Sequence, residues 1–297
     1  MTGDVRVRAM HAEDVEAAAA TLYEAFYDIH ARHNFLPSLF PSVDSARAVI
    51  SGLLDGRLAR CFTAVAGGEL VGSTFLTERG ATAGIGPVSV AIGRQGGGVG
   101  RRLMEALIAA AGPTTSLRLT QSLFNTRSFA LYHSLGFVPR DIVAWLEGGS
   151  LPTDTPPPAG TTVRPWSEAD LPAVLRLDQE LCGLDRAPDI ASYRTSGRGW
   201  LAEQDGRLLG YVVVLGHRHP LCGPATARDE PTLRALLAAA ASDAPGAEMR
   251  ILVSQTSLLE WLRAAGYRVR FFDSFMVRGA WRPPAGATLL PWFPETF

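Results

Sequence analysis

Two periodicities of apolar residues alternate along the first half of the chain and predict a mixture of helices and strands. Apolar residues recur at helical spacing at Val15, Ala19, Leu22 and Phe26. A second helix is expected over residues 45–54, after a proline-containing loop. Strands are expected at residues 5–10, 61–66, 70–77, 88–92, 116–120 and 138–147. Together these elements predict a mixed sheet flanked by helices, closed by the last of the strands.

The second half of the chain repeats sequence features of the first half. Residues 7–14 are echoed at 163–170, residues 68–72 at 206–210, and residues 135–137 at 265–267. The offset between matching segments becomes smaller along the chain, so the second copy reads as the same unit with deletions. We therefore expect a tandem duplication of one structural unit.

The stretch between the two copies is rich in proline and glycine, which is typical of a semi-rigid connector. The division that we expect is a first domain at residues 1–148, a linker at 149–160, a second domain at 161–281 and a tail at 282–297. The fold class expected for both domains is α/β, with the α+β character of a mixed sheet. Each domain is expected to form a twisted, mostly antiparallel sheet flanked by helices.

A glycine-rich turn between a strand and a helix carries the clearest chemical information. The expected strand at 88–92 runs into a turn over residues 95–100, and an amphipathic helix follows directly. The start of a helix has unpaired N–H groups and partial positive charge, and glycine lets an anion approach them. Arg101 and Arg102 place two positive charges at the positive end of the helix dipole, which is unfavourable unless an anion lies beside them. The segment predicts a pyrophosphate site; the alternative is a loop that only turns the chain.

Two common phosphate-binding motifs do not fit this turn. No Lys-Ser/Thr pair follows the glycines, so the segment is not a P-loop. Leu103 stands where the third glycine of a dinucleotide-binding fingerprint would fall after Gly98 and Gly100. The turn is therefore expected to hold a different phosphate ligand.

The turn and a second segment resemble two motifs of the GNAT acetyltransferase superfamily. Gln95-x-x-Gly98-x-Gly100 is similar to the acetyl-CoA motif of that family. Residues 125–137 are similar to its next motif, Asn-x-x-Ala-x-x-Leu-Tyr-x-x-x-Gly-Phe, with a serine in place of the alanine. The positions in register are Asn125, Leu131, Tyr132, Gly136 and Phe137. The first and fourth of these residues also suit the start and the end of a helix.

The resemblance implies acetyl-CoA as the co-substrate, without a metal, and direct transfer of the acetyl group to an amine in a ternary complex. It implies that the residues that bind acetyl-CoA are Val88, Ser89, Val90, Gln95, Gly96, Gly97, Gly98, Val99, Gly100, Arg101, Asn125 and Ser128. It also implies that Tyr132 protonates the departing thiolate. A backbone N–H group near Val90 is implied to hold the thioester carbonyl.

The candidates for a general base and for the acceptor pocket are chosen by their position. Glu78, at the end of the strand expected at 70–77, is the candidate base, with His33 or His30 behind it; the alternative for Glu78 is a solvated residue beside Arg79. Four residues are expected in the loop after the first helix, which lines the acceptor pocket in the resembling family: Tyr27, His30, His33 and Phe35. The alternative for these residues is plain loop surface.

The second copy lacks the residues that carry the chemistry of the first. No Gln-x-x-Gly-x-Gly follows its strand at 210–216, Leu262 aligns with Tyr132, and no Asn starts its last helix. The resemblance therefore implies an intact first domain and a degenerate second one. His217, His219 and Cys222 do not have a common zinc spacing, so we expect no metal site.

Composition limits the partners and the compartment. The chain has 297 residues and a net charge of −1, which gives no reason to invoke nucleic acid or an anionic membrane. Three unevenly spaced cysteines favour a reducing compartment, and the sequence shows no signal peptide or membrane-spanning run. We expect a cytoplasmic protein, and its tandem organisation resembles bacterial members of the family.

The function expected from these patterns is that of an acetyl-CoA-dependent N-acetyltransferase that acts on the primary amine of a small molecule. A rival from another class is an acyl-CoA-binding sensory or regulatory module without turnover, because the second copy has lost the motifs. The duplication is expected to give a monomer that is an internal pseudo-dimer, or else a homodimer.

Overall fold

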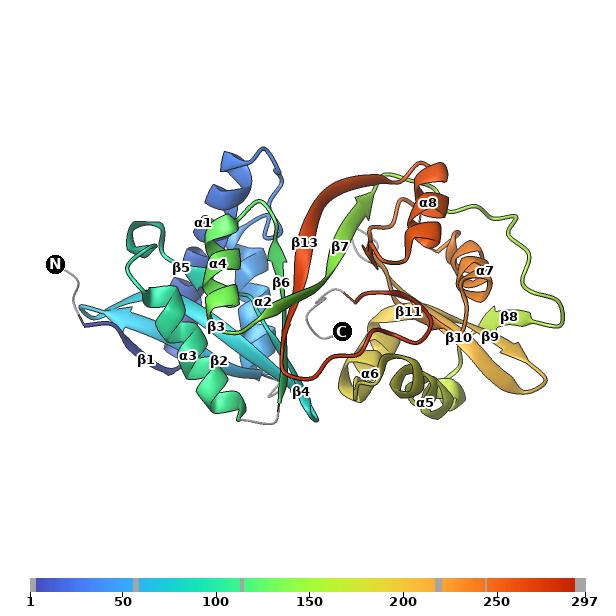
Figure 1. The fold of residues 1–297 in the computed structure, drawn as a ribbon, viewed down its shortest axis with the longest axis horizontal. Coiled ribbons are helices and arrows are strands. Elements are labelled where there is room, and N and C mark those ends of the chain that lie inside the picture. Colours follow the sequence, from blue (N-terminus) through green and yellow to red (C-terminus); the bar gives the residue numbers. More distant parts are fainter. Residues whose placement is uncertain (1–3, 56–58, 113–114, 217–220, 244, 292–297) are drawn as a thin grey trace. The chain divides into compact units, whose positions relative to one another are not determined.

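The computed structural model describes residues 4–55, 59–112, 115–216, 221–243 and 245–291 (Figure 1). The chain divides into two compact units. Unit 1 consists of Met1–Val138 and Met276–Ala280, and unit 2 consists of Pro139–Phe275 and Trp281–Phe297. The domain boundaries expected from the sequence stay a prediction, because compact units and family domains are different divisions of a chain.

Unit 1 combines strands with four α-helices in the described residues. Its helices are α1 (Val15–Arg32), α2 (Val43–Asp55), α3 (Val99–Ala111) and α4 (Thr126–Ser134). Its strands are β1 (Arg6–Ala9), β2 (Ala59–Ala66), β3 (Glu69–Arg79), β4 (Thr82–Ile85), β5 (Ser89–Val90) and β6 (Ser116–Ser122). The hairpin between β2 and β3 turns at Gly67 and Gly68, which both have positive φ.

The sheet of unit 1 carries helices on both faces. Its strand order is β1-β2-β3-β4-β6, with β5 paired to β3. Successive residues of a strand point to opposite faces, and β3 shows both faces being used. Phe75 packs in a cluster with α1 and α2, whereas Leu76 packs in a cluster with α3 and α4. The expectation of a mixed sheet flanked by helices is confirmed.

The strand next to β6 comes from the far end of the sequence. It is β13 (Arg268–Arg278), whose last residues, from Met276, belong to unit 1 and contribute Met276 to its core. The strand expected to close the first sheet, β7 (Val138–Glu147), exists but pairs with β13 and β12 (Met249–Leu252) in unit 2. The expected closure by residues 138–147 is therefore wrong. Local pattern predicts a strand but does not choose its partner.

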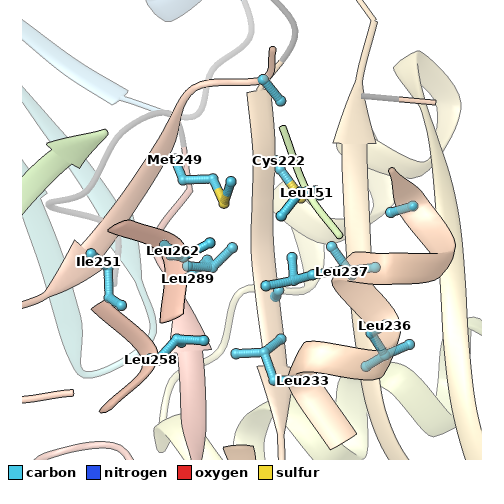
Figure 2. Packing of buried hydrophobic residues seen from close by; sticks show 14 of the residues in the cluster. Leu151, Cys222, Leu233, Leu236, Leu237, Met249, Ile251, Leu258, Leu262 and Leu289 are labelled. Atoms are coloured by element: carbon cyan, nitrogen blue, oxygen red, sulfur yellow. The ribbon is translucent and has the colours of Figure 1, made fainter. Parts of the chain in front are cut away.

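Unit 2 repeats the order of elements of unit 1. Its further strands are β8 (Thr162–Pro165), β9 (Gly197–Gln204), β10 (Arg207–Leu215), β11 (Leu221–Ala227) and β14 (Ala287–Leu289), in the order β14-β11-β10-β9-β8. Its helices are α5 (Leu171–Cys182), α6 (Ala187–Ser196), α7 (Glu230–Ala240) and α8 (Thr256–Ala264). Its largest core cluster packs α7 and α8 against β10, β11 and β12 (Figure 2).

An ion pair at the start of each copy shows that the sequence repeat is also a structural repeat. In unit 1 the Arg8 guanidinium donates two hydrogen bonds to Asp14, at 2.6 and 2.8 Å. At the matching place in unit 2, Arg164 donates to Asp170 at 2.9 and 2.8 Å. In both copies the aspartate also accepts the backbone N–H three residues before it. The pair ties the first strand to the helix that follows in each copy.

Three features of the sequence analysis need correction or lie outside the structure. Tyr27 and His30 belong to α1 and not to the loop after it, because the helix continues to Arg32. The strand expected over residues 88–92 is shorter: β5 ends at Val90 and a 3₁₀ turn begins at Ile92. His217 and His219 lie outside the described residues.

In the part of the chain that the structure describes, no helix is long and apolar enough to cross a membrane. The same residues contain no group of three or more His, Cys, Asp or Glu side chains arranged to hold a metal ion.

We predict that Asp14→Asn lowers the free energy of unfolding by about 1–3 kcal/mol at pH 7, because it removes the charge from a doubly bonded ion pair. The Arg8 guanidinium lowers the pKa of Asp14. The contribution of the ion pair to the free energy of unfolding is therefore fully present above the unfolded-state pKa of about 4, and it is lost as the pH falls below that value. Urea denaturation at pH 7 and pH 3 measures this difference. The exposed neighbour Glu13→Gln is the control, and an equal loss in both variants would contradict the prediction.

Candidate functional site

Two parallel strands of unit 1 diverge near the middle of its sheet. β4 pairs with β6 at Thr82↔Ser116, Ala83↔Leu117 and Gly84↔Arg118. Beyond this point β5 pairs only with β3 among the described strands, while β6 continues to Ser122. We call this divergence, between β5 and residues 119–122 of β6, the first split. Backbone groups of both strands face it, and ladder hydrogen bonds between the two strands do not use them.

The glycine-rich turn connects the first split to α3. Gly96 and Gly98 have φ near +83° and +84°, a region that side chains disfavour, and Gly98 directly precedes the helix. A Cβ atom at Gly98 would have no contact within 4 Å among the described residues, apart from its chain neighbours, whereas one at Gly100 would lie 3.3 Å from Leu131 and 3.7 Å from Val90. Gly100 thus lets α3 approach β5 and α4 closely. Gly96, Gly97 and Gly98 are exposed, and Val99 is buried.

Two side chains fix the strand that borders the first split. The Gln95 side-chain amide donates a hydrogen bond to the Val90 carbonyl at 3.2 Å. The Ser89 hydroxyl bonds the Ser73 hydroxyl of β3 at 2.9 Å and is buried. Val88 packs against the core cluster that contains Tyr132. Ser89 could therefore serve a ligand through its backbone groups, since its side chain is already engaged with β3.

The two arginines at the start of α3 have protein partners. Arg101 donates to the Ser134 hydroxyl at 2.7 Å and lies 3.7 Å from Glu105. Arg102 donates to the Val5 carbonyl at 2.6 Å. These contacts account for both cations without an anion. Binding of the cofactor by Arg101 stays a prediction.

The second motif, residues 125–137, contains α4, and the start of this helix faces the glycine-rich turn. Asn125 caps the helix, because its side-chain oxygen accepts the Ser128 N–H at 3.2 Å. The Ser128 hydroxyl donates to the Asn125 carbonyl at 2.9 Å and accepts from Gln121 at 3.0 Å. The cap predicted from the sequence is confirmed, and so is the left-handed glycine, Gly136, after the helix.

Arg127 is a candidate that the sequence analysis did not identify. It is exposed, and a Cβ atom built on Gly96 would lie 3.8 Å from its Nη1 atom. Among the described residues no hydrogen bond or ion pair holds it, in contrast to Arg101 and Arg102. An exposed cation beside exposed backbone N–H groups suits a phosphate. Only the fold brings this helix next to the turn, so sequence spacing gave no indication of it.

Tyr132 lies in the core to which β4 and β6, the two strands that diverge, both contribute residues. Its cluster includes Ile85 at the end of β4 and Leu119 on β6, the first residue beyond the last β4 partner. Its ring meets Phe137 edge-on, with centroids 6.3 Å apart, and 8% of the residue is exposed. Burial raises the pKa of the hydroxyl well above its ordinary value, so it keeps its proton at neutral pH.

Glu78 lies away from the first split. It pairs with Ala83 in the sheet, about 17 Å along β3 from Ser73, the partner of Ser89. Its carboxylate accepts a hydrogen bond from Arg60 at 2.5 Å, and 46% of its side chain is exposed. Its role as a base stays a prediction that this placement does not support.

The residues proposed for the acceptor gather around one further aromatic ring. Phe124, immediately before Asn125, stacks on Phe35 at 4.8 Å between ring centroids. The rings of His30 and His33 lie 5.4 and 5.2 Å from it. The structure therefore brings three of the four candidates together. Phe124 is a residue that the sequence analysis missed, because nothing in its local pattern distinguishes it from a core aromatic.

The fourth candidate lies on a neighbouring hollow. Tyr27 lines an open pocket of about 430 Å³ whose other lining residues are Leu36, Pro37, Ser38, Phe40 and Pro41. Phe40 also packs edge-on against Phe26, one turn of α1 before His30. The hollow is therefore mostly apolar and adjoins the aromatic residues around Phe124.

Both halves of the chain match one protein family. Residues 21–137 match the "Acetyltransferase (GNAT) family", and residues 174–290 match an "Acetyltransferase (GNAT) domain". The two matches together cover more than three quarters of the chain. The chain belongs to the GNAT acetyltransferase family, with two such domains in tandem. The resemblance seen in the sequence is confirmed, whereas the degeneracy of the second domain stays a prediction.

Solved structures share the fold over nearly the whole chain. A proposed acetyltransferase from Pyrococcus horikoshii has a TM-score of 0.72 at 20% identity, covering 96% of this chain and 92% of its own. A GCN5-related N-acetyltransferase from Sphaerobacter thermophilus has 0.64 at 17%, covering 95% and 98%. A tandem GNAT protein from the clavulanic acid biosynthesis pathway has 0.62 at 20%, covering 94% and 99%. No curated protein matches the sequence.

We predict that Gly98→Ala raises the dissociation constant for coenzyme A by about tenfold or more, because its methyl group points into space that only a ligand would use. Calorimetric titration measures the constant. Gly68→Ala is a matched control, since Gly68 has φ +85°, nothing within 4 Å of an added Cβ, and lies in a hairpin. Both variants should lose a similar amount of stability, about 1–2 kcal/mol. Equal affinities for coenzyme A would contradict the assignment.

Proposed function

We propose that unit 1 is an acetyl-CoA-dependent N-acetyltransferase that transfers acetyl to a primary amine of a small molecule in a ternary complex. The observation that carries the proposal is the first split, with a glycine-rich helix start at one end and a buried tyrosine beneath it. Members of the family use acetyl-CoA as co-substrate and act on small-molecule or protein amines. The proposal is completed by a cytoplasmic location and by a monomer or homodimer as the working state.

Coenzyme A is expected to bind along the first split. Its pyrophosphate would accept hydrogen bonds from N–H groups at the start of α3, where Gly96 to Gly98 leave the backbone uncovered. Its pantetheine arm, which carries amides, would pair with the free edge of β5 as an added strand does. A backbone N–H near Val90 would then hold the thioester carbonyl and stabilise the oxyanion of the tetrahedral intermediate.

Tyr132 is proposed as the acid that protonates the departing thiolate. The attack by the amine forms the C–N bond, the C–S bond breaks, and the sulfur needs a proton. Burial raises the pKa of a thiol as well, as it raises that of Cys61 to about 11. A thiolate released in the core beside Tyr132 is therefore a stronger base than in water, which offsets the weakened acidity of the buried hydroxyl.

The acceptor amine must be neutral when it attacks, and no side chain at the first split is assigned to take its proton. The exposed end of β3 keeps Glu78 beside Arg60, so we propose that water receives the proton. The acceptor would lie over Phe124, Phe35 and His33 at the end of β6. These rings favour an amine attached to an apolar or aromatic body.

The rival function, an acyl-CoA-binding regulatory module without turnover, makes a different prediction. Titration with acetyl-CoA, paired with a screen of amines by release of free thiol, separates the two functions. Transfer to an amine supports the enzyme. Binding without transfer to any amine would favour the module, and the absence of binding would contradict both.

We predict that Tyr132→Phe lowers kcat by about 10²–10⁴-fold with little change in affinity for acetyl-CoA, because only protonation of the leaving group is lost. Steady-state kinetics and calorimetry give the two quantities. Tyr267→Phe is the control, since Tyr267 is another buried tyrosine whose pKa is raised by burial, and it lies in unit 2. Full activity of the Tyr132 variant, or an equal loss in the control, would contradict the role.

The high pKa of Tyr132 also has a consequence for the pH profile of the wild-type enzyme. The rate should rise as the acceptor amine loses its proton, and no falling limb should appear below about pH 10. A falling limb near neutral pH that disappears in Tyr132→Phe would show that the hydroxyl titrates in that range, against the burial seen here.

We predict that Arg127→Gln raises the dissociation constant for coenzyme A by about 5–30-fold, because one charge-assisted phosphate contact is lost. Its affinity for pantetheine, which has no phosphate, should not change. Arg140, an exposed arginine outside unit 1, gives the control variant Arg140→Gln. A parallel titration with 3′-dephospho-coenzyme A distinguishes the pyrophosphate from the 3′-phosphate. Unchanged affinity for coenzyme A would remove Arg127 from the site.

A further inference from the structure

Unit 2 has a split between parallel strands at the position that corresponds to the first split. β11 and the residue before β12 meet at one parallel bridge, Leu221↔Glu248. The last parallel pair of unit 1 is Gly84↔Arg118. In unit 1, Gly84 stands two residues before the glycine of a Gly-Pro pair, and in unit 2, Leu221 stands two residues before the glycine of another. These glycines, Gly86 and Gly223, have φ +150° and +141°. We call the divergence of β11 from β12 the second split.

A strand of the chain's own C-terminal segment occupies the second split. β14 pairs antiparallel with β11 at Ala225↔Leu289, Thr226↔Thr288 and Ala227↔Ala287. On the other side, the Leu290 N–H donates to the Arg250 carbonyl of β12 at 2.9 Å. A Cβ atom at Gly223 would lie 2.6 Å from the Leu290 carbonyl oxygen, so the two backbones touch. The segment Ala287–Leu290 thus bonds both strands that diverge.

Gln255, the residue that aligns with Asn125, holds this segment through hydrogen bonds to the segment's backbone. Gln255 precedes α8 as Asn125 precedes α4. The glycines that follow the two helices, Gly266 and Gly136, stand at equal distances from these residues. The Gln255 side-chain amide donates to the Thr288 carbonyl at 2.8 Å and accepts the Thr288 N–H at 2.7 Å. One carboxamide thus satisfies both hydrogen-bonding groups of one backbone residue. An amide of pantetheine presents the same donor and acceptor pair to such a partner.

The side chains of the segment fill the space beneath the second split. Leu289 is fully buried in the cluster that contains Leu262, the residue that replaces Tyr132 in this copy (Figure 2). Thr288 is also fully buried, and its hydroxyl donates to the Ala225 carbonyl at 2.8 Å. An apolar core therefore occupies the position that corresponds to Tyr132, the candidate acid of unit 1, and to the thioester that would lie beside it.

We propose that Ala287–Leu290 is a built-in ligand of unit 2, which closes the acyl-CoA position of the second domain and leaves one acyl-CoA site per chain. The choice of acyl-CoA as the excluded ligand rests on the proposed function. The closure itself rests on backbone pairing within unit 2. It gives a physical reason why the second domain has no need of a glycine-rich turn or a tyrosine in α8.

Hydrogen exchange of the full chain tests the closure directly. A peptide covering residues 284–291 should exchange slowly in the free protein, because the Thr288 and Leu290 amides donate to Gln255 and Arg250. Saturating acetyl-CoA should leave this peptide unchanged, while peptides covering residues 88–100 and 125–131 become protected. Fast exchange in the free protein, or exchange that acetyl-CoA accelerates in residues 284–291, would overturn a closed second split.

A variant connects the protection to the carboxamide of Gln255. Gln255→Ala should increase exchange at Thr288 at least tenfold while kcat stays as in the wild type. Thr256→Ala, at the next residue of the same helix start, is the matched control, because the Thr256 hydroxyl donates to the Val253 carbonyl and to no other group among the described residues. If exchange at Thr288 does not change in Gln255→Ala, the carboxamide does not hold the segment.

Calorimetry then decides the number of sites. Coenzyme A should bind one per chain in the wild type, and Gly98→Ala should weaken that binding about tenfold or more without exposing a second site. Two molecules per chain, or residual tight binding in Gly98→Ala that Gln255→Ala abolishes, would place a ligand in unit 2 and overturn the proposal. A wild type that binds no coenzyme A would contradict the proposed function, whereas the exchange result would still decide whether the second split is closed.

Discussion

The divergence of two parallel strands is the constraint on which the rest of each unit depends. Where β4 and β6 stop pairing after Gly84 and Arg118, their backbone groups need partners that the sheet no longer supplies. The two units satisfy this need differently. Unit 2 inserts its own residues Ala287–Leu290, whereas unit 1 presents the open edge next to exposed glycines and an exposed arginine. One sheet geometry can therefore support a ligand site or a closed core, according to what lies between the strands.

The residues around each split are consistent with this difference. At the first split Gly100 lets α3 reach β5, and Gln95 fixes the Val90 carbonyl, so small and polar residues keep the approach to the strand free. At the second split Leu262 and Leu289 pack together and Gln255 binds backbone. Leucine in place of tyrosine removes a hydroxyl that would be buried there without a ligand to receive it, which would cost roughly 1–3 kcal/mol.

The sequence predicted the features that depend on neighbouring residues. The cap at Asn125 and the left-handed glycine after the same helix, Gly136, follow from short patterns, because they involve contacts over a few positions. The tandem arrangement also followed from the repeated segments. The length of β5 was overestimated, because the apolar run of residues 88–92 has the composition of a strand whether or not a second partner lies beside it.

What the sequence could not supply were contacts between distant segments. The placement of β13 next to β6, and of β7 next to β12, depends on the whole chain. The strands β13 and β7 have similar apolar patterns, and either could pair with strands close to it in the sequence. Arg127 beside Gly96 and Phe124 beside Phe35 are likewise products of the fold. The same holds for Gln255 and Thr288, which are far apart in sequence. In sequence, Gln255 reads as the loss of an asparagine cap, whereas in the structure its carboxamide binds a peptide group. Under the proposed closure of the second split, the loss of a motif in a duplicated domain records a change of ligand, from a diffusing molecule to a segment of the same chain.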